Sequence, residues 1–424
     1  MLQPKIYSLS NGIPVIIDSV PGFESLTMGA HIKSGSRNEV NPNDFGAAHL
    51  LEHMAFKGTK NRDKHQITTA IEDIGGEINA YTTWNVTAYN ATVPTPHKNL
   101  AIDIIADIVQ NPTVPQEELM KEKLVVTQEI KSYEDDPYAT LERATLAAIF
   151  RGGMQHDIAG NAESVLALSR ETLLNYFNAH YSAKNCILVL SGGGLEDTTA
   201  TLSFMEKLFG GWAAFDVPKY EFSTYINAVS HTQKSELSHS YFKAVWPTLP
   251  ATSRESNQAI KSMMRVLGAG FSSRLFQKIR EELGLVYSVG AESMAYEDIG
   301  IATIEAQTEP AKLKQTVAAI ASLCRDIKSG KAPIKEEELA RAKEMTKGAL
   351  IMGLETTSRR ADFFATRSIL FGGIDDMKKN IDIIDSVSIS DVSAAVAEVF
   401  ANPPSIITLG MEHDLPLSEW QGWF

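Results

Sequence analysis

Two histidines and one glutamate lie within five consecutive residues of this chain, His49-Leu50-Leu51-Glu52-His53. A helix brings positions i and i+4 to the same face, so His49 and His53 can share one metal ion while Glu52 lies beside them. Two imidazoles with a neighbouring carboxylate are the arrangement that a zinc hydrolase uses. The alternative is that these are ordinary core or surface residues, and composition alone gives roughly 0.03 matches by chance. The segment therefore predicts a metal site.

The residues around this motif predict a buried helix. Asn43 and Asp44 offer an N-cap, and Gly58 is expected to end the helix. Apolar residues occupy nearly every side of the segment, so the helix should be buried. Buried polar groups are costly unless they are bonded, and one metal ion would satisfy the whole His-Glu-His stripe.

Glu129 is the expected third protein ligand, because a catalytic zinc site takes three protein ligands and leaves one position open. It lies in the segment 117–133, where apolar and acidic residues follow helical spacing. Glu122 lies two turns earlier on the same face and is expected to hold a histidine or another ligand in place. Because buried carboxylates are costly unless paired or bound to metal, the apolar neighbours favour this interpretation over a solvated charged helix.

Longer motifs around these residues resemble the pitrilysin/insulinase family, whose inverted His-x-x-Glu-His order is typical of the inverzincins. Within that family the chain is most similar to the catalytic β-subunit of mitochondrial processing peptidase and its single-chain bacterial relatives. The resemblance runs through nearly the whole chain. It is strongest in two stretches, Gly35-Ser36-Arg37-Asn38-Glu39 and Gly46-Ala47-Ala48-His49-Leu50-Leu51-Glu52-His53-Met54-Ala55-Phe56-Lys57-Gly58-Thr59.

The resemblance implies the roles of the site residues. His49, His53 and Glu129 would hold one zinc ion per chain, and Glu52 would be the general base. Asn79-Ala80-Tyr81-Thr82-Thr83 matches the family's edge strand, on which Asn79, Ala80 and Tyr81 would bind substrate by backbone pairing. The alternative for this last segment is a plain strand.

A second resemblance lies in the C-terminal half, where Arg280 and Tyr287 occur in Arg280-Glu281-Glu282-Leu283-Gly284-Leu285-Val286-Tyr287. In the family, such an Arg and Tyr pair is donated to the distant zinc site. A guanidinium and a phenol are suitable donors to substrate carbonyls and to the oxyanion formed on hydrolysis. Without the family, Arg280 would be read as a surface residue and Tyr287 as a strand residue.

Two departures from the family limit the substrate prediction. The stretch 134–143 does not reproduce the acidic pair with which the mitochondrial enzyme reads an arginine near the cleavage point. The family's turn at Gln155–Gly160 is also altered, and His156 within it is expected at the surface.

Length, charge and cysteine content exclude several classes of protein. At 424 residues the chain is too long for one ordinary core and predicts two or more domains. The net charge of −13 argues against nucleic acid as a partner. No apolar run is long enough to span a membrane, and residues 1–20 lack the features of a secretion signal. Two cysteines are too few for a disulfide framework and favour a reducing interior, such as the bacterial cytoplasm, with periplasm or mitochondrial matrix left open.

An internal duplication predicts an α+β fold of two homologous halves. A pattern of helix end, strands and helix that starts near residue 71 recurs from residue 280, offset by about 209 to 220 residues, as expected for two copies of one domain. We expect an N-terminal zinc-binding domain over 1–211, a linker over 212–233 and a C-terminal domain over 234–424. The resemblance implies an antiparallel-rich sheet with helices in each half, the two halves enclosing a cavity.

These observations predict a zinc-dependent endopeptidase that hydrolyses peptides or unfolded, presequence-like segments in an enclosed chamber. One alternative is a structural, non-catalytic subunit of the same fold, like the core proteins of the respiratory bc1-type complex. Another is a catalytic subunit that requires an inactive homologous partner. Arg280 and Tyr287 favour a self-sufficient chain and a homodimer, with a heterodimer left open.

Overall fold

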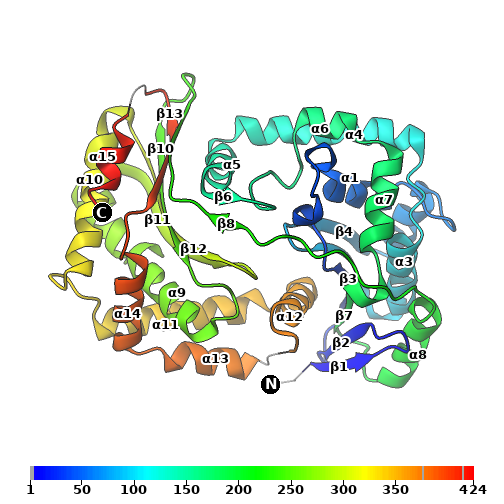
Figure 1. Ribbon diagram of the computed structural model, residues 1–424. Helices are drawn as coiled ribbons and strands as arrows, with labels where there is room; N and C mark the ends of the chain where they lie inside the picture. The colour runs from blue at the N-terminus through cyan, green and yellow to red at the C-terminus, as the bar shows by residue number, and fades with distance from the viewer. Residues whose placement is uncertain (1–3, 375–376, 413–414) are drawn as a thin grey trace. The chain divides into compact units, whose positions relative to one another are not determined.

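The computed structural model describes residues 4–374, 377–412 and 415–424, which form two compact units (Figure 1). Unit 1 contains Met1–Ser132, His156–Glu221 and Ile351–Met377, and unit 2 contains Tyr133–Gln155, Phe222–Leu350 and Lys378–Phe424. In the described residues, no helix combines the length and apolar character needed to cross a membrane.

Unit 1 is built on a six-stranded sheet in the order β1-β2-β7-β3-β5-β4. All neighbouring strands are antiparallel except the parallel pair β2 and β7. β4 pairs with β5 alone, so it is an edge strand, as expected for the segment around Tyr81. The strands are β1 (Lys5–Ser8), β2 (Pro14–Ser19), β3 (Ser25–Ile32), β4 (Glu77–Thr82), β5 (Thr87–Pro94) and β7 (Cys186–Gly192). The helices are α1 (Ala47–Ala55), α2 (Lys64–Glu72), α3 (Lys98–Gln110), α4 (Gln116–Asp135), α6 (Ala162–Ala167), α7 (Arg170–His180), α8 (Thr198–Phe209) and α12 (Thr357–Phe371).

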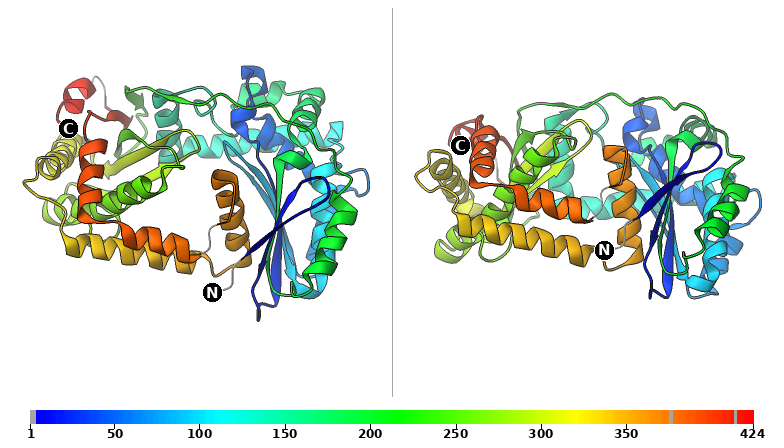
Figure 2. Two further views of the ribbon diagram at one scale, coloured as in Figure 1. Left: turned by 60° about the horizontal axis from the view of Figure 1, so that its bottom comes forward. Right: turned by 90° about the horizontal axis from the view of Figure 1, so that it is seen from below.

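Both faces of this sheet are covered, because the side chains of a strand alternate between its faces. The residues of β3 that belong to the main core, with α1 and α3, are Leu26, Met28, Ala30 and Ile32. On the other face lies α12, with α3 and α8 on the opposite side of the sheet (Figure 2). There Thr27 contacts Thr357 at 2.8 Å, and His31 contacts Asp362 at 3.1 Å. A smaller apolar cluster completes this second face, formed by Ile16, Ile187, Val189, Ala361, Phe364 and Ala365.

Unit 2 repeats this architecture with a five-stranded sheet in the order β11-β12-β10-β13-β9. The pairing directions correspond one by one to those of β4-β5-β3-β7-β2, including one parallel pair, β13 and β9. The strands of this sheet are β9 (Val229–Gln233), β10 (Ser240–Thr248), β11 (Val286–Ala295), β12 (Gly300–Thr308) and β13 (Ser405–Gly410). The short strands β6 (Phe150–Arg151) and β8 (Thr224–Tyr225) pair in a separate two-stranded sheet. The helices are α5 (Pro137–Ile149), α9 (Arg254–Gly268), a π-helix (Phe276–Glu282), α10 (Leu313–Lys328), α11 (Glu336–Gly353), α13 (Met377–Ser386), α14 (Ile389–Val399) and α15 (Leu417–Gln421). The expected α+β fold of two homologous halves is confirmed.

Each half of the chain gives one helix to the sheet of the other half. α12 comes from the C-terminal half and packs on β2, β3 and β7, whereas α5 comes from the N-terminal half and packs on β9, β10 and β13. In unit 2, Lys243 of β10 forms an ion pair with Glu142 of α5 and lies 3.5 Å from Glu305. Each sheet needs this extra helix because a sheet with two apolar faces must bury both.

The exchange makes the units differ from simple consecutive domains. Residues 133–155 belong to unit 2 and residues 351–377 to unit 1, although the predicted domains were 1–211 and 234–424. The change from unit 1 to unit 2 after residue 221 falls within the expected linker, which also contains the short strands β8 and β9. Hydrophobic periodicity identifies helices but does not reveal which sheet each one covers.

A buried ion pair anchors α12 to the sheet of unit 1. Arg360 donates from Nε and Nη2 to the two carboxylate oxygens of Asp18, at 2.6 and 2.8 Å, and Ser191 donates to the same carboxylate. Asp18 is completely buried. A charge in such a place is stable only while its partners remain.

We therefore expect Arg360→Met to lower the free energy of unfolding by about 3–5 kcal/mol, because it leaves the buried carboxylate of Asp18 without a cation. Urea-induced unfolding followed by circular dichroism measures this change. Lys121→Met is the control, because Lys121 pairs with Glu118 on the exposed side of α4, and its loss should leave the free energy of unfolding nearly unchanged. Equal losses in the two variants would contradict the assigned role of Arg360.

Candidate zinc site

The first helix of the candidate metal site is α1, which is almost entirely buried, as its composition predicts. Its N-terminus differs from the expectation. Asn43 and Asp44 lie in a separate 3-10 turn, and the residue that precedes the helix is Gly46, in a left-handed conformation with φ of 93°. A side chain at Gly46 would meet the carbonyl of Ala159 at 2.6 Å, so the close packing there also requires glycine.

A buried carboxylate caps α1 in place of the predicted residues. Glu39 accepts hydrogen bonds from the backbone N–H of Gly46 at 2.9 Å and of Ala48 at 2.7 Å. Burial raises the pKa of Glu39 well above its usual value, against the effect of these hydrogen bonds. Its position at the positive end of the helix dipole favours the ionised form. The prediction of Asn43 and Asp44 as the cap was wrong because the capping carboxylate belongs to Glu39, seven residues before Gly46, which is outside the usual N-cap position.

The second helix of the candidate metal site is α4, which presents Glu122 and Glu129 to α1. Glu122 is buried and Glu129 is partly exposed, while Leu119, Val126 and Ile130 on the same side are buried. The helical spacing predicted for this segment is therefore observed, with the apolar residues on the packed face.

His49, His53 and Glu129 converge on one point. One ligand atom from each lies within 4.8 Å of the others, and in the part of the chain that the structure describes they are the one such group that could hold a metal ion. Glu129 Oε2 lies 3.8 Å from His49 Nε2 and 3.7 Å from His53 Nε2. A tetrahedral zinc ion at ~2.0–2.1 Å from each ligand would place ligand atoms ~3.3–3.5 Å apart. Two imidazoles and a carboxylate at these separations fit zinc with small movements.

His53 is oriented for metal binding by its second nitrogen. Its Nδ1 lies 3.2 Å from Glu122 Oε2, while the other oxygen of Glu122 receives Lys57 Nζ at 2.7 Å. When Nδ1–H donates to Glu122, Nε2 carries the lone pair and faces Glu129. The expected position of Glu122 behind a histidine is observed, and Lys57 adds a cation that sequence reasoning missed.

Glu52 lies in the same buried region with its carboxylate held by the edge strand. Thr82 of β4 donates its hydroxyl to Glu52 Oε2 at 2.5 Å. Burial raises the pKa of Glu52, the Thr82 hydrogen bond and the neighbouring His53 lower it, and Glu129 raises it. A carboxyl group with a raised pKa is suited to accept a proton and to release it again.

The predicted substrate residues lie on β4, whose side chains alternate between the sheet's two faces. Thr82 points toward α1, and Tyr81 points toward α12, where its hydroxyl donates to Asp362 at 3.1 Å. Asn79 and Ala80 precede them, and Asn79 is exposed. An edge strand held firmly on both faces offers a fixed row of backbone groups for an added strand.

Arg280 and Tyr287 lie together in unit 2. Arg280 is on the π-helix, and its guanidinium carbon lies 4.9 Å from the ring centre of Phe276 and 5.9 Å from that of Tyr287. Tyr287 is 69% exposed at the start of β11. Their contribution to the site in unit 1 stays a prediction.

Sequence reasoning missed three residues that support the site, Glu39, Lys57 and Thr82. Each lies in a segment that resembles the family, yet none was assigned a role. Lys57 carries a usable signal, because it follows His53 by four residues and so continues the His49-His53 stripe. Glu39 and Thr82 act across loops and strands, which spacing does not reveal. His156, expected at the surface, is instead half-buried and stacks on Phe45 with ring centres 3.8 Å apart.

Comparison with known proteins gives a consistent result across the chain. Residues 15–161 match the insulinases, peptidase family M16, and residues 167–346 match the M16 inactive domain. The chain is 30% identical to an uncharacterized zinc protease of Rickettsia bellii, over 96% of this chain and 97% of that protein. It is also 30% identical to an uncharacterized zinc protease of Bacillus subtilis, over 97% of this chain and 99% of that protein.

Solved structures share the whole fold at lower identity. A protease from Helicobacter pylori has a TM-score of 0.85 at 20% identity, covering 96% of this chain and 99% of that one. A chain of complex III2 from Candida albicans has a TM-score of 0.83 at 19% identity, covering 99% of each chain.

We expect His49 to make the metal-free protein acid-sensitive. Burial, with a smaller effect of His53, lowers the pKa of His49 to about 4, although Glu129 acts in the opposite direction. In the unfolded chain a histidine has a pKa near ~6.5, so between these values the unfolded state binds more protons and stability falls as the pH is lowered. His49→Gln should therefore reduce the loss of stability between pH 6.5 and pH 4.

Urea midpoints of the metal-free protein across this pH range measure the effect. His65→Gln, which changes an exposed histidine of α2, is the control. An acid sensitivity that is the same in wild type and His49→Gln would reject the burial of a neutral His49.

Proposed function

Because the chain belongs to the insulinase family of peptidases, M16, we propose that it is a zinc-dependent endopeptidase. The single observation that carries this proposal is the convergence of His49, His53 and Glu129 with Glu52 beside them. The fit of this donor set to zinc and the relatives described as zinc proteases support it. We assign one zinc ion to each chain.

The residues of the site divide the work of peptide hydrolysis. When bound, zinc supplies Lewis acidity that makes a water molecule acidic near neutral pH and polarises the scissile carbonyl. Glu52 takes the proton of the attacking water and passes it to the leaving amine. Thr82 holds the carboxylate of Glu52 in one orientation, which reduces the motion needed for each transfer. Glu122 and Lys57 keep the Nε2 of His53 available.

Substrate would bind as an extra strand along β4. Backbone pairing to Asn79, Ala80 and Tyr81 reads an extended main chain more than particular side chains. Peptides and unfolded segments, including presequence-like ones, can become extended, whereas a folded domain cannot do so without unfolding. The enclosed chamber and the homodimer stay predictions of the resemblance.

A non-catalytic subunit of the same fold is the alternative function. The likeness to a chain of complex III2 concerns the fold and does not carry a role to this chain. A purely structural subunit has no need for a base beside a metal site. The presence of Glu52 together with all three candidate ligands therefore favours the peptidase.

Glu52→Gln is expected to keep zinc and to lose turnover by several orders of magnitude, because the change removes the base and spares the ligands. Digestion of a peptide library, with zinc content measured on the same samples, checks both parts. His53→Ala is the matched variant, and it should lose zinc as well as activity. Undiminished cleavage by Glu52→Gln would reject the assigned base.

Arg280→Ala and Tyr287→Phe should lower kcat/KM by roughly 10²- to 10³-fold without loss of zinc, if these residues donate hydrogen bonds to the substrate and the oxyanion. Steady-state kinetics with one fluorogenic peptide gives the values. Lys278→Ala on the same π-helix is the control, because its ion pair with Glu282 is exposed. Activity that is intact after both substitutions would reject their role while leaving the zinc site unaffected.

A further inference from the structure

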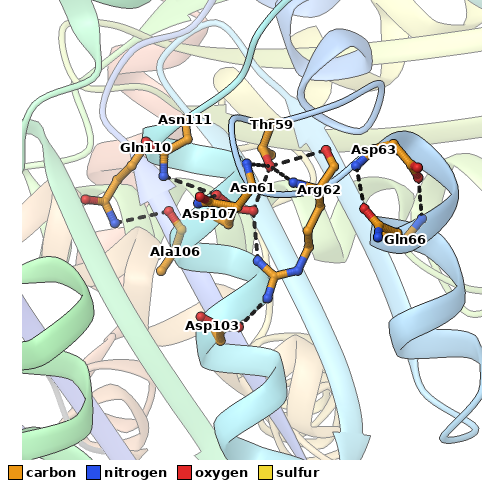
Figure 3. Close-up of polar contacts among 10 residues, drawn as sticks. All are labelled: Thr59, Asn61, Arg62, Asp63, Gln66, Asp103, Ala106, Asp107, Gln110 and Asn111. Atoms are coloured by element: carbon orange, nitrogen blue, oxygen red, sulfur yellow. Dashed lines mark hydrogen bonds and ion pairs between the residues drawn. The ribbon is translucent and has the colours of Figure 1, made fainter.

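A buried carboxylate on α3 gathers the loop that follows α1. Asp107 is 4% exposed and accepts four hydrogen bonds from side chains (Figure 3). Its Oδ2 receives Thr59 Oγ1 at 2.7 Å and Arg62 Nη1 at 2.8 Å, and its Oδ1 receives Asn61 at 2.6 Å and Asn111 at 3.1 Å. Both carboxylate oxygens act as acceptors. In an asparagine side chain at this position, the NH2 group would face hydrogen-bond donors in place of one of these oxygens.

The loop held in this way follows α1 and contacts the segment that precedes α4, and these are the two helices that carry the candidate zinc ligands. Gly58 accepts hydrogen bonds from the backbone N–H and the hydroxyl of Thr113, at 3.0 Å each. Lys60 donates its backbone N–H to Asn111 at 3.0 Å, and Thr59 forms a β-bridge with Pro112. The segment 111–113 leads directly into α4, which starts at Gln116. Asp107 therefore fixes the end of α1 and the approach to α4 relative to each other.

Lys57 joins this loop to the candidate metal site. It is the residue before Gly58, and its ammonium group lies 2.7 Å from Glu122, which in turn contacts Nδ1 of His53 at 3.2 Å. A contact chain thus runs from Asp107 through the loop to Lys57, Glu122 and His53. Each step is a hydrogen bond, an ion pair or a direct peptide connection.

We propose that Asp107 is a positioning residue of the zinc site, which acts by holding the loop so that Lys57 reaches Glu122. This inference rests on the proposed function, because it assigns Asp107 to the same metal site. Asp107 itself makes none of its hydrogen bonds to the candidate ligands. Partners outside the ligand set of a metal site change its affinity by about 10- to 100-fold, and we expect Asp107 to lie at the lower end of this range.

A double-mutant cycle tests the proposal in the full chain. Zinc is removed from the purified protein, and the Kd for zinc is measured by competition with a chromogenic chelator. Asp107→Asn and Lys57→Met should each raise this Kd by about 10-fold. Because both act through the same contact with Glu122, the double variant should show about the same 10-fold change and not the 100-fold product.

A general loss of stability should not produce this pattern of Kd values, and a matched control distinguishes the two effects. Arg360→Met removes a buried ion pair of the same unit from the face of α12, and it should lower the urea midpoint while leaving the Kd for zinc unchanged. If Asp107→Asn does not fold, Asn61→Ala takes its place, because it removes one of the four hydrogen bonds. It should give a smaller increase in the Kd for zinc, and it should give no further increase when it is combined with Lys57→Met.

The outcomes separate this inference from the proposed function. An unchanged Kd in Asp107→Asn, or independent effects that multiply in the double variant, would overturn the positioning role while zinc binding and cleavage by the wild type stand. A wild-type protein that binds no zinc would instead overturn the proposed function.

Discussion

Burial of α1 is the constraint on which the rest of the site depends. The helix lies in the core of unit 1, yet it carries two imidazoles and a carboxylate, none of which can be left unbonded at low cost. Its partners come from three other segments of the chain. Glu39 caps its first turn, Thr82 of β4 holds Glu52, and Glu122 of α4 holds His53. The Nε2 atoms of the two histidines face Glu129, at the position where a metal would bind, while Nδ1 of His49 is buried without a hydrogen-bond partner among the described residues.

The corresponding helix of unit 2 is also buried on one face, but it lacks the polar residues of α1. The two sheets have corresponding strand orders, and each receives one helix from the other half of the chain. The helix that follows the central strand β10 in unit 2 is α9, which buries Ala259, Met263 and Leu267 and contains neither of the histidines that define α1. A helix that buries only an apolar face needs no ligand set, so one copy can keep the packing while the other carries the candidate ligands. The sheet architecture is therefore compatible with a metal site in one copy and none at the corresponding helix of the other.

The ligand set could be predicted from sequence because each part of it follows a local period. His49, Glu52 and His53 share one helical turn, and Glu122 and Glu129 share one face two turns apart, so spacing indicates which side chains lie together on each helix. The need for a third zinc ligand and the resemblance to the family paired the two helices. The α+β class and the two homologous halves followed from the repeat near residues 71 and 280. The exchange of α5 and α12 and the contact of Lys57 with Glu122 join residues that are far apart in sequence, and the cap is provided by Glu39, seven residues before Gly46. Those contacts depend on which faces are left uncovered after the sheets form. Hydrophobic periodicity in a single sequence does not show which segments cover those faces.

The charges around α1 also indicate why the site should carry a divalent ion. Glu52, Glu122 and Glu129 bring three carboxylates into this partly buried region, and Lys57 supplies an ammonium group that contacts Glu122. Three negative charges against one positive charge leave two negative charges when the histidines are neutral. A partly buried excess of negative charge is unfavourable. The raised pKa of Glu52 is consistent with it, because burial is the first cause of the increase and the nearby charge of Glu129 adds to it. A zinc ion would balance both charges and allow Glu52 to remain ionised and ready to act as a base. In this arrangement Lys57 has a second effect beyond orienting Glu122, because without it the same ion would leave the site with a net negative charge.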